Sequence, residues 1–187
     1  KLADEKVLPF FNFVRMTQLA VGRNWRDAND AQKKSLIDEF RTLLVRTYST
    51  SLTQFRNQTI DVKPLKVAPT DTEIVVKTQV NQPGGQPIPI DYSMEKSGDS
   101  WKVYDVLIDG VSLVTNYRSS FNTEIQKSGI DGLIKSLSER NRLIHHFFRE
   151  HAANATHPAG QRVMISELSS MIKLFDHADA LVTPIYL

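Results

Sequence analysis

Two Asp–Tyr neighbours are the side chains of this sequence best suited to acid–base chemistry. Asp91 lies beside Tyr92, and Tyr104 lies beside Asp105. A carboxylate base next to a phenol donor is a combination that enzymes use to move protons. Both pairs fall in segments with strand character, where neighbouring side chains point to opposite faces of a sheet. Each pair is therefore expected to be split across the sheet, so we predict no catalytic residues and no enzyme.

The histidines are the second set of residues that suggest chemistry, in this case metal binding. The run HHFFREH superficially suggests a zinc site, but Glu150 directly precedes His151, so the HExxH spacing of zinc helices is absent. Consecutive histidines on a helix diverge by about 100°. We therefore predict no metal site and no cofactor, and exposed or capping roles for His145, His146, His151, His157 and His177.

The bulk composition excludes several further functions. The chain of 187 residues contains no cysteine, which rules out disulfides, thiolate catalysis and thiolate metal ligands. Its net charge of +2 comes from scattered Lys and Arg residues, a pattern too weak to indicate nucleic-acid binding. Gly84-Gly85 lacks the helix and the Lys-Ser/Thr pair of a phosphate loop, so we predict a turn there. No apolar run approaches the ~20 residues of a membrane span.

Helical patterns flank the centre of the chain. From Asp4 to Val21 apolar residues recur at spacings of three and four, and Gly22 is a plausible end for this helix. The segment 29–56 gives the clearest helix, because Asn29 and Gln32 match a capping box.

Four strand-like runs lie between these helices and the C-terminal part of the chain. The last run begins at Trp101, is apolar on both faces, and reaches an Asp109-Gly110 corner after which a helix to about Lys127 is expected to start at once. A short helix from Asp131 follows. Consecutive strands joined by short turns predict an antiparallel meander, in an α+β fold whose helices cover one face of the sheet. The first three runs span residues 59–65, 72–80 and 88–95.

Several long segments, in register, resemble the MlaC family of periplasmic phospholipid-binding proteins, also called toluene-tolerance auxiliary components. The segments are VLPFFNFVRMTQLAVGRNWRDANDAQ, FRTLLVRTYSTSL, WKVYDVLIDGVSLVTNYRSSF and SGIDGLIKSL. They cover roughly residues 4–142. The resemblance implies a cone related to NTF2-like domains, with a four-stranded curved antiparallel sheet and an apolar cavity between sheet and helices.

The resemblance also implies a function. The protein would be a soluble periplasmic carrier that moves phospholipid between the outer and inner membranes and maintains outer-membrane lipid asymmetry. Its implied partners are an inner-membrane MCE-protein/ABC transporter complex and an outer-membrane lipoprotein-porin complex, and we expect a monomer. The alternatives are an NTF2-like interaction module without ligand, which would have a filled core, and an isomerase-type enzyme, because the cone-shaped fold also hosts such enzymes.

The sequence departs from the family at both ends. Members carry further helices before the segment that matches VLPFF, whereas six residues precede Val7 here. We predict a phospholipid-binding domain over residues 1–142 and an atypical helical tail over 143–187. Two tail helices, Leu143 to His151 and Val163 to Ala180, are expected to cover apolar surface that the missing helices would otherwise cover.

A lipid carrier needs an enclosed apolar wall more than it needs polar contacts. A diacyl phospholipid exposes roughly 30 methylenes worth about 0.8 kcal/mol each, so burying its tails gains more than ~20 kcal/mol gross. Candidate cations for the phosphate head at the mouth are Arg23, Arg26, Arg46, Arg118 and Lys127. The candidate lining residues are Leu44, Tyr48, Ile74, Val76, Ile90, Tyr92, Val103, Val106, Ile108, Val111, Val114, Tyr117, Phe121, Ile125 and Ile134.

Overall fold

The computed structural model describes residues 5–53, 58–81 and 83–150. The chain divides into two compact units, one up to Asn122 and one from Thr123 onward. The described elements combine helices with an antiparallel sheet, which confirms the predicted α+β class. In chain order they are η1 (Leu8–Phe10), α2 (Phe13–Val21), η2 (Gly22–Arg26), α3 (Asp30–Thr53), β1 (Thr59–Val62), β2 (Glu73–Asn81), β3 (Ile88–Ser97), β4 (Ser100–Ile108), β5 (Val111–Ser112) and α4 (Leu113–Glu150).

The described strands form one open antiparallel sheet in the order β1-β2-β3-β4-β5, so the predicted meander is confirmed. The sheet has five strands, however, and not the predicted four. Asp109 and Gly110 both have positive φ, 50° and 80°, which is the geometry of a two-residue hairpin turn. The chain therefore returns as β5, with Ile108 opposite Val111, before α4 begins. The prediction that a helix starts directly after this corner was wrong.

A β-bulge interrupts β4. Ser93 on β3 pairs with Asp105, and the next residue, Met94, pairs with Val103, so Tyr104 is left as the extra residue. An extra residue reverses the alternation of side chains, and it brings Val103 and Val106 to the same face. Part of the apolar pattern that the sequence shows on both faces of β4 therefore belongs to a single face, because the bulge shifts the alternation.

The first helix is shorter than the predicted 4–21. Phe11 has extended backbone and forms a parallel bridge with Val103 of β4. The Asn12 N–H donates to the Val103 carbonyl at 2.8 Å, and the Asn12 side chain then caps α2 by accepting from the Arg15 N–H at 3.0 Å. Pairing with β4 thus outweighs the helical periodicity at this point.

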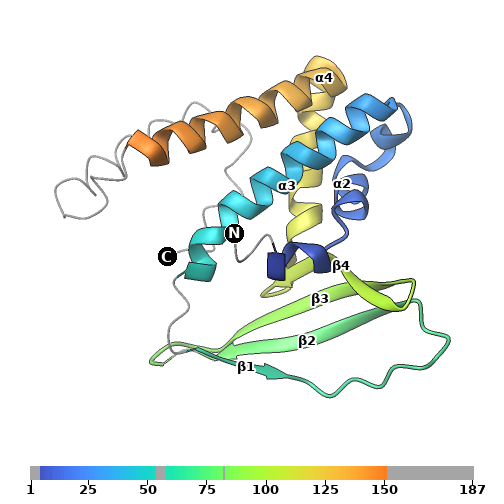
Figure 1. Ribbon diagram of the computed structural model, residues 1–187, viewed down its shortest axis with the longest axis vertical. Helices are drawn as coiled ribbons and strands as arrows, with labels where there is room; N and C mark the ends of the chain where they lie inside the picture. The colour runs from blue at the N-terminus through green and yellow to red at the C-terminus, as the bar shows by residue number, and fades with distance from the viewer. Residues whose placement is uncertain (1–4, 54–57, 82, 151–187) are drawn as a thin grey trace. The chain divides into compact units, whose positions relative to one another are not determined.

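Helix α3 begins as predicted. Asn29 Oδ1 accepts from the Gln32 N–H at 2.8 Å, and Gln32 Oε1 accepts from the Asn29 N–H at 3.0 Å, which is a complete capping box. Helices α2 and α3 lie on the same side of the sheet (Figure 1). The buried stripe of α3 consists of Leu36, Phe40, Leu43 and Leu44.

Helix α4 contains the predicted break at Gly129, where φ is 72° and ψ is −177°. The segment after it is not the short helix predicted from Asp131, because it continues to Glu150 and includes the start of the predicted tail helix at Leu143. The division into domains at residue 142 stays a prediction. The predicted helix from Val163 to Ala180 lies outside the described residues.

Candidate functional site

The candidate site is the apolar face of the sheet that carries all seven lining residues predicted from the strands. Three cross-strand rows of side chains build this face. Within each row the residues stand directly opposite one another, where their side chains contact. The rows are Ile74–Met94–Val103, Val76–Tyr92–Val106 and Thr78–Ile90–Ile108.

Burial varies across this face, and the side chains on β1 are the most exposed. Val103 and Val106 are 6 % and 8 % exposed and form a cluster with Leu113, against which half-buried neighbours from β3 and β4 pack. At the other edge Val62 extends the row of Thr78, and Ile60 stands opposite Val80. Ile60 and Val62 are 52 % and 65 % exposed. The apolar face is therefore closed around Val103 and Val106 and open at β1.

The few polar groups on this face are neutral. The Thr78 hydroxyl donates to the Ile90 carbonyl at 2.6 Å, so it needs no further partner. Burial raises the pKa of Tyr92, which keeps its phenol uncharged at neutral pH. A neutral apolar surface of this kind suits hydrocarbon and disfavours a charged ligand.

The Asp–Tyr pairs do not form an acid–base site. Asp91 stands opposite Lys77, in the row beside that of Tyr92 and on the other face of the sheet. The Asp105 carboxylate accepts from the Val106 N–H at 2.8 Å, from the Val114 N–H at 3.2 Å and from the Ser112 hydroxyl. Asp105 therefore anchors the start of α4.

The lining residues predicted outside the main strands differ in how far they are buried. Leu44, Val114, Tyr117 and Phe121 are buried, and Val111 on β5 is 45 % exposed. Phe40 of α3 meets Tyr117 and Phe121 edge-on, with ring centroids 5.3 and 5.2 Å apart. These aromatic rings pack as helix core. Their lining role stays a prediction.

Three further predicted residues are not assigned to this face. Tyr48 lies on α3 but outside the residues whose side chains the structure describes. Ile125 and Ile134 lie in the unit that begins at Thr123 and are half-buried there. The structure does not assign any of the three to the sheet face.

Met94 and Phe11 are among the residues of the apolar face that the prediction missed. Met94 and Phe11 both pack against the Val103–Val106–Leu113 cluster. Met94 follows the alternation of Ile90 and Tyr92 along β3, so the period of two was a usable signal for it. Phe11 gave no such signal, since its bridge to β4 connects residues that are far apart in sequence.

The predicted head-group cations lie in several places. The Arg118 guanidinium donates twice to the Leu19 carbonyl, at 2.9 and 2.7 Å, and so caps the end of α2. Arg23 and Arg26 are exposed on η2, and Lys127 is exposed in the second unit. Arg46 lines a groove on α3.

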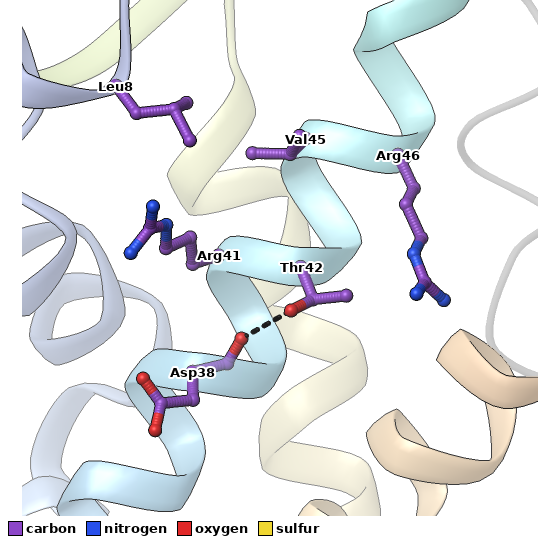
Figure 2. A pocket seen from close by; sticks show the side chains of 6 residues that line it. All are labelled: Leu8, Asp38, Arg41, Thr42, Val45 and Arg46. Carbon is purple, nitrogen blue, oxygen red and sulfur yellow. Dashed lines mark hydrogen bonds between the residues drawn. The ribbon is translucent and has the colours of Figure 1, made fainter. Parts of the chain in front are cut away.

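This groove of about 280 Å³ lies between η1 and one face of α3 (Figure 2). Within the groove the Thr42 hydroxyl donates to the Asp38 carbonyl at 2.8 Å. Arg41 and Arg46 supply the positive charge of the groove. The Arg41 guanidinium lies 5.5 Å from the centre of the Phe13 ring. The groove is lined by Leu8, Asp38, Arg41, Thr42, Val45 and Arg46.

Two kinds of site are absent from the described part of the chain. There, no three His, Asp or Glu residues gather as a possible metal site. None of the helices described is both long and apolar enough to cross a bilayer.

These features place the chain in a class of small α+β proteins with a partly exposed apolar sheet face. The chain belongs to the MlaC family, whose model, described as MlaC protein, matches residues 1–139.

Relatives and a solved structure agree with this membership. The chain is 29% identical over 106 residues to the toluene tolerance protein ttg2D of Pseudomonas putida, a match covering 57% of this chain and 49% of that protein. It is 26% identical over 136 residues to the intermembrane phospholipid transport system binding protein MlaC of Haemophilus influenzae, covering 71% and 64%. The matches thus span less than two thirds of either relative.

The structural neighbour is more similar. It is the phospholipid-binding protein from Ralstonia solanacearum in complex with a phospholipid. It superposes with a TM-score of 0.71 at 42% sequence identity, over 77% of this chain and 80% of that chain.

Proposed function

We propose that this protein is a periplasmic phospholipid carrier that holds acyl chains along the apolar sheet face. The observation that carries the proposal is the set of three cross-strand rows, whose side chains are mostly apolar and remain partly exposed except at Val103, Val106 and Thr78. An apolar surface left accessible in this way gains free energy when a ligand covers it, at about 25 cal/mol per Å². The phospholipid in the structural neighbour at 42% identity supports the same ligand class.

The expected head-group selectivity is low. The tails supply most of the binding free energy, since each buried methylene contributes about 0.8 kcal/mol, and the face offers a neutral Tyr92 and a satisfied Thr78 as its polar groups. The phosphate would remain in water near exposed cations, where a charge-assisted hydrogen bond adds only a modest term.

The carrier would receive and deliver lipid at two membranes. Its proposed partners are an inner-membrane MCE-protein/ABC transporter complex and an outer-membrane lipoprotein-porin complex, and its proposed role is to maintain outer-membrane lipid asymmetry. Support comes from the membership in the MlaC family and from a relative that is a binding protein of an intermembrane phospholipid transport system.

The direct test is to extract the purified full chain with organic solvent and to identify its lipids by mass spectrometry. We expect phospholipid in near-stoichiometric amount. Absence of lipid, together with no uptake from vesicles, would favour an interaction module without ligand. Turnover of a steroid-like or ester substrate would favour an isomerase-type enzyme instead.

A further inference from the structure

One guanidinium on α2 spans three neighbouring strands of the sheet. Arg15 Nη2 lies 2.6 Å from Glu73 Oε1 on β2, and Arg15 Nη1 pairs with Glu95 on β3. The Arg15 Cζ also lies 3.8 Å from the centre of the Tyr104 ring, on the bulge of β4, which is cation–π distance. We call Arg15, Glu73, Glu95 and Tyr104 the Arg15 clasp.

The Arg15 clasp fixes the peptide that carries Phe11. Asn12 Nδ2 donates to Glu95, the same carboxylate that Arg15 binds. The Asn12 N–H donates to the Val103 carbonyl, which seats the neighbouring Phe11 in its bridge with β4. The Phe11 side chain packs against the cluster at the closed end of the apolar sheet face. Phe11 therefore covers this end, and the clasp holds Phe11 there.

The clasp depends on its cation. Glu73 and Glu95 stand directly opposite each other on β2 and β3, and like charges in this position repel. Partial burial opposes the charge of Arg15, but bonds to both carboxylates outweigh it and raise the pKa of Arg15. The hydrogen bond from Arg15 is the main cause of the lowered pKa of Glu73. Without Arg15 the repulsion between the two carboxylates would no longer be offset, and Glu95 would hold Asn12 less firmly.

The clasp is also open to solvent. The Glu73 side chain is 52 % exposed, whereas Glu95 is 17 % exposed. Ions in solution therefore reach the β2 partner and screen its attraction to Arg15. An ion pair with such an exposed partner contributes little free energy, so it is readily broken.

We propose that Arg15 is a positioning residue for lipid retention, which keeps Phe11 over the Val103 end of the apolar sheet face, and that release of the Arg15 clasp lets an acyl chain leave at that end. This inference rests on the proposed carrier function. Arg15 acts through Phe11 and contacts no lipid itself.

The test measures how fast a fluorescent phosphatidylglycerol leaves the loaded full chain for acceptor vesicles of phosphatidylcholine. Arg15→Gln is expected to release it roughly tenfold faster, since affinity changes appear mostly in the dissociation rate. Arg15→Lys should restore part of the retention by keeping the charge. Moderate salt should accelerate release from the wild type and leave Arg15→Gln unchanged, because the screened pair is already lost.

Two controls separate the clasp from general effects. Lys33→Gln removes the same charge from a lysine beside Trp25, and it should release lipid at the wild-type rate. Phe40→Leu loosens the helix core without touching the clasp, and it should lower the melting temperature with unchanged release. If Arg15→Gln does not fold, Glu73→Gln removes the exposed partner and should also accelerate release.

The outcomes are distinguishable. A wild type that takes up no phospholipid would overturn the carrier function, and this inference with it. A loaded wild type, with Arg15→Gln and Glu73→Gln releasing at its rate, would overturn the inference alone. Acceleration by Phe40→Leu to the same extent would also overturn it, since release would then follow stability and not the clasp.

Discussion

Val103 and Val106 are three residues apart on β4, yet both are buried in one cluster with Leu113. In a regular strand an odd separation places two side chains on opposite faces. The extra residue Tyr104 removes this conflict, because Met94 pairs with Val103 while Ser93 pairs with Asp105. The bulge thus joins two halves of β4 into one apolar face and presents the Tyr104 ring to Arg15.

Deletion of Tyr104 is expected to leave the chain folded. Without the bulge, Val103 and Val106 would be two residues apart and would still share a face. We expect cooperative thermal unfolding with a loss below about 3 kcal/mol, the range of ordinary mutations. Circular dichroism measures the cooperativity of thermal unfolding, and denaturant titration measures the loss of unfolding free energy.

Deletion of Leu107 is the matched control in the same strand. It would put Val106 and Ile108 next to each other and therefore on opposite faces, with a cost above about 4 kcal/mol or no folded protein. If the two deletions destabilised the protein equally, the bulge would not be what sets the register.

A charge on the apolar face should remove lipid. Val76→Asp places a carboxylate in the row with Tyr92 and Val106, where hydrocarbon would have to desolvate it. We expect about tenfold less bound phospholipid per protein, by mass spectrometry of the purified chain. Gln79→Asp adds the same charge to the other face of β2, and it should keep wild-type lipid content. Equal loss in both variants would contradict the placement of the ligand.

The aromatic rings between α3 and α4 should matter for stability first. Phe121 is 3 % exposed and meets Phe40 edge-on at 5.2 Å, so Phe121→Ala should cost about 3–5 kcal/mol of unfolding free energy. Ile60→Ala, at an exposed position of β1, should cost less than about 0.5 kcal/mol. Denaturant titration compares the two, and a small effect at Phe121 would mean that the cluster can repack.

Glu73 should make the free energy of unfolding depend on pH in the acid range. Hydrogen bonding and charge from Arg15 lower the pKa of Glu73 in the folded state, so its ionised form stabilises the fold. This contribution is complete above the ordinary pKa of glutamate and is lost as pH falls through the lowered value. The stability difference between wild type and Glu73→Gln should therefore shrink in acid. In an Arg15→Gln background the same substitution should no longer change the pH profile.

Local patterns predicted the elements whose causes are local. The capping box at Asn29 and Gln32, the strand alternation of Ile74 and Val76, and the break at Gly129 each depend on a few neighbouring residues. Within each strand a period of two groups Ile74 with Val76, Ile90 with Tyr92 and Val106 with Ile108, whereas Val103 joins their face only through the bulge.

The errors have a common cause in contacts between distant residues. The predicted first helix is broken because Phe11 pairs with Val103, and no local signal marks that partner. The predicted helix after the Asp109-Gly110 corner is delayed because Val111 returns to pair with Ile108. In both places a backbone hydrogen-bonding partner on β4 outweighs the weaker helical propensity.

Periodicity and turn residues were sufficient to predict the α+β class, the order of the strands and the apolar character of the face. The tertiary structure alone decided that Tyr104 is a bulge, that Arg118 caps α2 through Leu19, and that Arg15 links α2 to three strands. Each of these depends on which distant groups meet in space. The position of a charged residue in the sequence does not indicate which distant residue it contacts, whereas the spacing of apolar residues indicates which of them share a face.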